Sequence, residues 1–184
     1  MPEWISTILI AAGTSLFVGW FISPRLEARN RRIQEVHQAR EKFFQSVCIL
    51  EIGCARLRGF HFSPGASEAA QATLRGERDR WLARIEETSA SLIDDADSYI
   101  NCFRRGWEWE AALMYVTAAR MLWISSWPVA AKLVRLQELS KEAATAFQPR
   151  PWRIRAILRA EGKLDQLMEK LLTDLETNID SPPR

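Results

Sequence analysis

Residues 4–23 read WISTILIAAGTSLFVGWFIS, a stretch of twenty residues without a charged side chain. As a helix it would be about 30 Å long, which matches the hydrocarbon core of a bilayer. Trp4 and Trp20 lie sixteen residues apart. That is about 24 Å along a helix, so both rings would reach the membrane interfaces, where tryptophan is favoured. The stretch therefore predicts a transmembrane helix over residues 4–23.

Two other interpretations of residues 4–23 compete with a membrane anchor. A cleaved signal peptide would begin with basic residues and have a shorter apolar run, whereas this chain begins Met1-Pro2-Glu3. A buried helix of a soluble domain would normally have a polar face, whereas the polar residues here are only serines and threonines. Both alternatives stay open, and the anchor is favoured.

The charges on either side of the stretch predict its orientation. Only Glu3 precedes it, whereas four arginines and one glutamate follow closely: Arg25, Arg29, Arg31, Arg32 and Glu27. Positive charge stays on the cytoplasmic side of a membrane. We therefore expect a single-pass protein of the cell membrane, with residues 1–3 outside and the rest of the chain in the cytoplasm. The arginines would contact anionic lipid headgroups there.

Small residues recur every four positions within the predicted anchor, at Thr7, Ala11, Ser15, Gly19 and Ser23. Such spacing lets two transmembrane helices approach closely, which predicts association with a second copy or with another membrane protein. The alternative is that small residues are simply common in membrane helices.

The composition of the remaining chain is that of one domain, which we place at residues 24–178, followed by a flexible tail at 179–184. The net charge of +2 gives no reason to expect nucleic acid as a partner. Arginine outnumbers lysine 20 to 5, which we interpret as a sign of a GC-rich bacterial genome. The three cysteines, Cys48, Cys54 and Cys102, lack metal-site spacing. Free thiols would agree with a reducing compartment.

The periodicity of the chain predicts helices almost throughout. No stretch alternates with period two, and glycines and prolines cluster at a few boundaries. We expect helices over about 24–59, 67–103, 109–127, 129–147 and 153–178. The predicted fold class is therefore all-α: a single transmembrane helix followed by a cytosolic bundle of four to five helices with a long first helix.

Apolar residues recur at heptad spacing along this first helix. One row contains Leu26, Ile33, Val47 and Cys54, and the other contains Val36, Phe43, Leu50 and Leu57. Arg40 and Arg29 interrupt the rows. Such rows predict contact with another helix. Val36, Phe43 and Leu50 are thus candidate association residues, with the partner helix either within the chain or in another copy.

Residues 111–131, AALMYVTAARMLWISSWPVAA, could form a second membrane span by length. Arg120 lies at its middle, where a charge is costly in lipid, so we expect a bundle helix instead. The tryptophans in 107–127 would then belong to the core, or alternatively form a face that contacts membrane or partner. They are Trp107, Trp109, Trp123 and Trp127.

Catalytic motifs are missing from the sequence. His37 and His61 have no metal-ligand spacing, and no glycine-rich phosphate loop is present. The sequence DDAD at 94–97 would bring Asp94 and Asp97 to one helical face, where two carboxylates can contribute to a magnesium site. A solvated acidic face is the favoured interpretation. We predict no cofactor and no enzymatic activity.

A basic cluster near the last helix is the clearest polar candidate. Its residues are Arg150, Trp152, Arg153, Arg155, Arg159 and Lys163. Cations at a helix start oppose the helix dipole, so an anionic partner would be stabilising: a lipid surface, an acidic protein or, least expected, nucleic acid. The alternative is a solvated face with salt bridges to other helices.

These patterns predict a non-catalytic helical interaction module tethered to a membrane, either an oligomer or a subunit of a membrane complex. Two alternatives are kept. The first is a bilayer-perturbing effector that uses the Trp-rich helix 107–127, and the second is a metal-dependent enzyme that uses the DDAD face.

Overall fold

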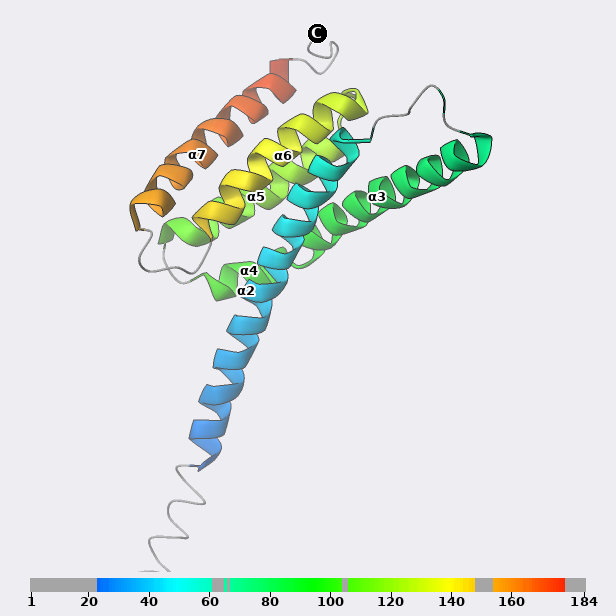
Figure 1. The fold of residues 1–184 in the computed structure, drawn as a ribbon. Coiled ribbons are helices and arrows are strands. Elements are labelled where there is room, and N and C mark those ends of the chain that lie inside the picture. Colours follow the sequence, from blue (N-terminus) through cyan, green and yellow to red (C-terminus); the bar gives the residue numbers. More distant parts are fainter. Residues whose placement is uncertain (1–22, 61–64, 66, 104–105, 148–153, 178–184) are drawn as a thin grey trace, which may run out of the picture. The chain divides into compact units, whose positions relative to one another are not determined.

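The computed structural model describes residues 23–60, 65, 67–103, 106–147 and 154–177. All regular elements in these ranges are helices, as expected (Figure 1). They are α2 (Ser23–Arg58), α3 (Glu68–Asp94), α4 (Ala96–Cys102), α5 (Gly106–Ile124), α6 (Val129–Ala146) and α7 (Ile154–Thr177). Within the described ranges, no helix has both the length and the apolar character needed to cross a bilayer. The predicted anchor falls almost wholly at residues 1–22, outside the described part of the chain.

The chain divides into two compact units, Met1–Gln38 and Ala39–Arg184. The described part of the first unit is the N-terminal portion of α2. The second unit contains the rest of α2 and the other helices.

Helix α5 is the central element of the second unit. It packs against α3, α4, α6 and α7, while α6 and α7 pack extensively on each other. Because α5 is surrounded by helices, it buries residues on more than one side, and several of these are alanines that allow close packing. The buried set is Ala111, Ala112, Tyr115, Val116, Ala118, Ala119 and Leu122.

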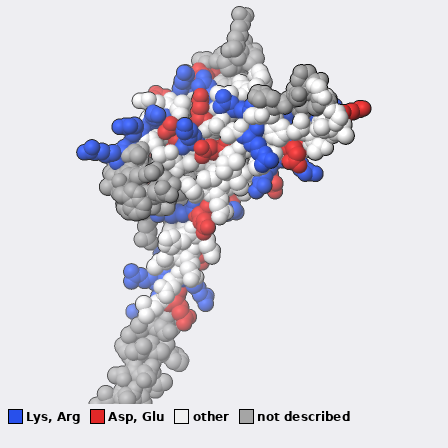
Figure 2. Space-filling model, viewed as in Figure 1, with Lys and Arg blue, Asp and Glu red and all other residues white. Residues whose placement is uncertain are grey.

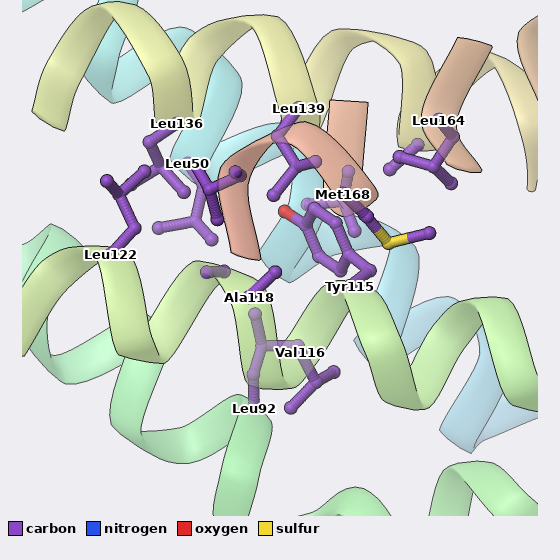
Figure 3. Close-up of a cluster of buried hydrophobic side chains, with 14 of the residues drawn as sticks. Leu50, Leu92, Tyr115, Val116, Ala118, Leu122, Leu136, Leu139, Leu164 and Met168 are labelled. Atoms are coloured by element: carbon purple, nitrogen blue, oxygen red, sulfur yellow. The ribbon is translucent and has the colours of Figure 1, made fainter. Parts of the chain in front are cut away.

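The core of the second unit is formed by side chains from helices that are far apart in the sequence. Figure 3 shows Leu122, Ala118 and Tyr115 of α5 among Leu50 of α2, Leu136 and Leu139 of α6, and Leu164 and Met168 of α7. The α7 residues Leu164, Met168, Leu171 and Leu175 are also buried.

Phe43 of α2 is the centre of an aromatic cluster. Its ring contacts four others edge-on, with centroid distances of 5.0 Å to Tyr99, 5.3 Å to Phe103, 5.9 Å to Tyr115 and 5.0 Å to Phe147. Edge-to-face aromatic pairs add about 0.5–1.5 kcal/mol each beyond burial. One side chain thus connects α2 to α4, to α5 and to the end of α6.

The prediction of a single helix over about 67–103 is wrong, because the helix is interrupted at Asp95. This residue has φ −91° and ψ 3°, and it separates α3 from α4. Its carboxylate pairs with Lys42 of α2 at 2.6 Å and accepts a hydrogen bond from Ser91 at 3.2 Å. These contacts hold the side chain at the break, and beyond it Tyr99 and Cys102 are buried. The start of α3 is as expected, since Ser67 caps it by accepting a hydrogen bond from the Ala70 N–H.

Candidate interaction surfaces

The first candidate surface is the basic arm, which we define as residues 25–38 of α2. Arg25, Arg29, Arg31 and Arg32 are all exposed, and Figure 2 shows basic side chains projecting from this helix. None of the four forms an ion pair with another residue in the described ranges. The arm therefore presents a solvent-exposed row of cations.

Apolar side chains lie among these arginines. Leu26 is 52% exposed and Ile33 is 46% exposed, while Val36 is half-buried. Both Leu26 and Ile33 are about half exposed, so this part of the apolar rows is not buried by the chain's own described helices. The sequence identified Val36 as an association residue, but it did not indicate that Leu26 and Ile33 would be left uncovered.

The same heptad rows are buried in the second unit. Phe43, Val47, Leu50 and Cys54 are fully buried by helices of their own chain. The sequence left open whether the helices that contact Phe43 and Leu50 belong to the same chain or to another copy. In the structure they belong to the same chain. Arg40, which interrupts one row, pairs with Glu108 of α5 at 3.0 Å.

The second candidate surface is the α5 strip, which we define as Met114, Met121 and Ile124. These residues lie on the outer side of α5, and Ile124 is 64% exposed. Val129, the first residue of α6, is also exposed. The strip was not predicted, because the tryptophans were the conspicuous feature of this segment. The available signal was the run from residue 121 to residue 131, which has no charged side chain.

The tryptophans of this region belong mainly to the core. Trp127 is buried, and Trp109 and Trp123 pack against the core while partly exposed. Trp123 donates its indole N–H to Glu86 at 3.1 Å, and the Lys132 ammonium donates to the Trp123 carbonyl at 2.7 Å. Of the two interpretations of these residues, packing in the core fits the three whose side chains are described.

Residues 111–131 are not one continuous helix. Helix α5 ends at Ile124 and α6 begins at Val129, with a turn between them. Arg120 donates a hydrogen bond to Ser89 at 3.3 Å and lies 3.7 Å from Glu86 of α3. The alternative of a second membrane span across this segment has no support in the described helices.

The third candidate surface is the predicted basic cluster near α7. Arg155 and Arg159 are exposed, and Leu158 beside them is 61% exposed. Lys163 pairs with Glu142 of α6 at 3.4 Å, so for this residue the salt-bridge alternative applies. Arg150, Trp152 and Arg153 lie outside the described residues.

The acidic sequence at 94–97 is divided by the helix break. Asp94 and Asp97 are exposed on different helices, whereas the carboxylate with contacts is that of Asp95, paired with Lys42. Among the described residues, no three histidine, cysteine or acidic side chains come together as metal ligands would. The sequence did not indicate Asp95 as a contact residue, because nothing in its spacing reveals a contact with Lys42, 53 positions earlier in the chain.

Buried polar and thiol groups occur within the second unit. Tyr115 and Ser140 share a buried hydrogen bond of 2.9 Å between α5 and α6, and burial raises the pKa of Tyr115 above its ordinary value. Burial also raises the pKa of Cys54 to about 12. Cys48, Cys54 and Cys102 are all free thiols. A buried thiol with a raised pKa is a weak nucleophile, so Cys54 is suited to packing.

The remaining association and anchor residues, Trp4, Ala11, Ser15, Gly19 and Trp20, lie outside the described part of the chain. Comparison of the chain with protein-family models, curated proteins and solved structures gives no match.

Proposed function

We propose that this chain is a non-catalytic interaction module: a helical bundle tethered to a membrane by residues 4–23, which works in an oligomer or as a subunit of a membrane complex. The bundle would face the cytoplasm, since the arginines that follow residue 23 favour that side.

The observation that carries the proposal is the unequal burial of α2. Its heptad rows are covered by the chain's own helices from Phe43 onward, while Leu26 and Ile33 in the basic arm are exposed. A helix that continues an apolar row into solvent gains stability when something else covers that row. The exposed α5 strip adds a further apolar surface, and the charge-free sequence of residues 4–23 favours a membrane anchor.

A bilayer-perturbing effector is less well supported. It would require residues 111–131 to enter lipid, and the burial of Tyr115, Trp127 and Leu122 argues against this, because they would have to leave a packed core. A metal-dependent enzyme at 94–97 is also less well supported, since Asp94 and Asp97 lie on either side of the helix break.

The first test of the tether is extraction of membranes from expressing cells with alkaline carbonate. The natural chain should stay in the membrane pellet. Leu16→Arg, which places a charge near the middle of the stretch, should move a large share to the supernatant, because such a charge costs about 2.5–3.5 kcal/mol. Thr14→Ser is the matched control and should stay in the pellet.

The result that would refute the tether is recovery of the natural chain in the supernatant. Aggregation is separated from insertion by floating the same membranes on a density gradient, since an aggregate sinks and an inserted chain floats with lipid.

A further inference from the structure

The basic arm carries more positive charge than its own chain neutralises. Residues 25–38 contain four arginines and two glutamates, which gives a net charge of +2 with His37 neutral. All four arginines are exposed and without an ion pair to any other described residue. Arg25 and Arg29 are four positions apart and Arg29 and Arg32 three, spacings at which like charges destabilise a helix. An anionic partner would remove that repulsion.

The charges are unevenly distributed around the helix. At about 100° per residue, one arc of about 120° contains all the large apolar residues of the arm and three of its four arginines. This arc is the cationic face: Arg25, Leu26, Arg29, Arg32, Ile33 and Val36. Glu27, Gln34 and Arg31 lie on the opposite side. Cations and exposed apolar side chains thus share one face, from which both glutamates are excluded.

A second copy of the arm is a poor occupant of this face. Arg29 takes a heptad position of the row that continues to Val36 and Phe43, so in a parallel pair of arms it would face its own equivalent. Burying two like charges at such a seam is unfavourable. A partner helix would also need an unbroken apolar row, whereas here Arg29 interrupts it between Leu26 and Ile33.

A lipid headgroup layer has no such requirement. Lipid phosphates and carboxylates move freely, so they can pair with arginines at any spacing, while apolar side chains enter the boundary between headgroups and acyl chains. Arg25 also follows the charge-free stretch after only one residue. The arm would therefore begin at the membrane surface if residues 4–23 span the bilayer.

We propose that the cationic face of the basic arm binds the headgroup layer of an anionic bilayer, with Arg25, Arg29 and Arg32 contacting lipid anions and Leu26 and Ile33 inserting between headgroups. This inference rests on the proposed membrane tether. It assigns a lipid-binding role to one face of α2 and gives Arg31 none.

The test uses the full chain in vesicles of phosphatidylcholine, either pure or mixed with phosphatidylserine. The natural cysteines Cys48, Cys54 and Cys102 are replaced by alanine. A fluorescent label is then attached at Ile33→Cys, on the cationic face, or at Gln34→Cys, on the opposite face. Lipids brominated in the acyl chain quench a label only when it reaches the bilayer. The label at position 33 should be quenched in vesicles with phosphatidylserine and much less in pure phosphatidylcholine, and the label at position 34 should be quenched in neither.

Matched single substitutions test the charge directly. Arg29→Gln and Arg31→Gln remove the same charge from opposite sides of the arm. Arg29→Gln should lower the ratio of lipid-bound to free arm about fivefold, the effect of one arginine at an anionic surface, while Arg31→Gln should change it by less than about twofold. Circular dichroism checks that both variants keep their helix content.

Several outcomes would overturn the inference. Equal quenching at both positions, or no dependence on phosphatidylserine, would exclude a specific anionic-lipid face. A disulfide between the position-33 cysteines of two copies, formed in the unlabelled variant, would identify a second copy as the occupant. If the unlabelled cysteine at position 33 is protected from a thiol reagent only in native membranes, which contain other proteins, the occupant is an acidic protein and not lipid. Washing the same vesicles at alkaline pH separates the two proposals. A retained chain with an unquenched label at position 33 refutes the lipid face alone, and a released chain refutes the tether.

Discussion

Gly53 is a point where α2 and α3 approach closely. A Cβ atom at this position would lie 3.3 Å from Cγ1 of Ile85 and 3.3 Å from Cε3 of Trp81. The guanidinium carbons of Arg56 and Arg84 lie 5.2 Å and 5.6 Å from the centroid of the Trp81 ring. Ile85 is fully buried, so this neighbour of Gly53 has little room to move.

We predict that Gly53→Val lowers the free energy of unfolding by about 1–3 kcal/mol, the usual effect of overpacking. Gly76→Ala in α3 is the control, because a Cβ there meets nothing within 4 Å. That change should instead stabilise the chain by about 0.5–1 kcal/mol through helix propensity. Urea unfolding of both variants measures the difference, and equal effects of the same sign would mean that α2 and α3 are not in close contact.

The buried thiol of Cys54 makes the free energy of unfolding depend on pH in the alkaline range. Burial raises the pKa of its thiol from 9.0 to about 12, so the folded chain holds this proton more tightly than the unfolded chain does. The stabilisation is complete below pH 9, the pKa of the unfolded thiol, and is lost progressively as the pH rises toward 12.

The expected result is a fall in the free energy of unfolding between about pH 8 and pH 10.5 that is steeper for the natural chain than for Cys54→Ala. The comparison uses the slope of the free energy of unfolding against pH in each variant. The loss of stability from the smaller alanine side chain does not change with pH, and the titration of other groups is common to both variants, so neither affects the difference between the slopes. Parallel slopes would mean that the Cys54 thiol reaches solvent in the folded state.

At the scale of elements, α2 illustrates what a sequence pattern can and cannot predict. The helix itself, Ser23–Arg58, was expected within one or two residues, because its heptad rows and flanking Pro24 and Gly59 are local signals. The point along α2 at which its apolar rows cease to be buried by other helices was not expected. Leu26 and Phe43 occupy heptad rows in the same way, and one is 52% exposed while the other is fully buried. The difference depends on where the other helices lie, which periodicity does not encode.

Helix α3 failed as a prediction for a related reason. The apolar spacing continues from Ile85 through Leu92 to Tyr99, as a single helix would give, and all three residues are buried. The break at Asp95 coincides with the ion pair to Lys42 on another helix, which is a tertiary contact. The same limit applies to the candidate surfaces. The arginines of the basic arm could be identified from composition, whereas the uncovered Met114, Met121 and Ile124 of the α5 strip required the packing of α5.

The role of α2 in the second unit leads to a prediction for the element. Phe43→Ala should lower the free energy of unfolding by about 3–5 kcal/mol, because it removes a fully buried ring that contacts four other aromatic residues. Ile52→Ala on the exposed side of the same helix should change it by less than about 0.5 kcal/mol. Both are measured by urea unfolding, followed in the near-ultraviolet circular dichroism of the aromatic cluster. A small effect of Phe43→Ala would contradict the packing of α2 into this core.

At the scale of the whole molecule, the two units present different kinds of surface. On the face drawn in Figure 2, acidic and basic side chains are interspersed over the second unit, a distribution that favours solubility over binding of one charged partner. The basic arm of the first unit has the opposite character, since one side of it carries only cations and apolar residues. This division is what we expect of a folded module joined to a membrane through a lipid-contacting segment.

The central claim is that the chain works at a membrane together with another polypeptide chain, either a copy of itself or a different protein. It is tested most directly by purifying the chain from native membranes in mild detergent through a C-terminal tag, followed by mass determination and protein identification. We expect a particle whose protein mass exceeds the 21.1 kDa of one chain, either as a whole multiple of that mass or with a second polypeptide at fixed stoichiometry. A homogeneous particle containing a single copy and no other protein would contradict it.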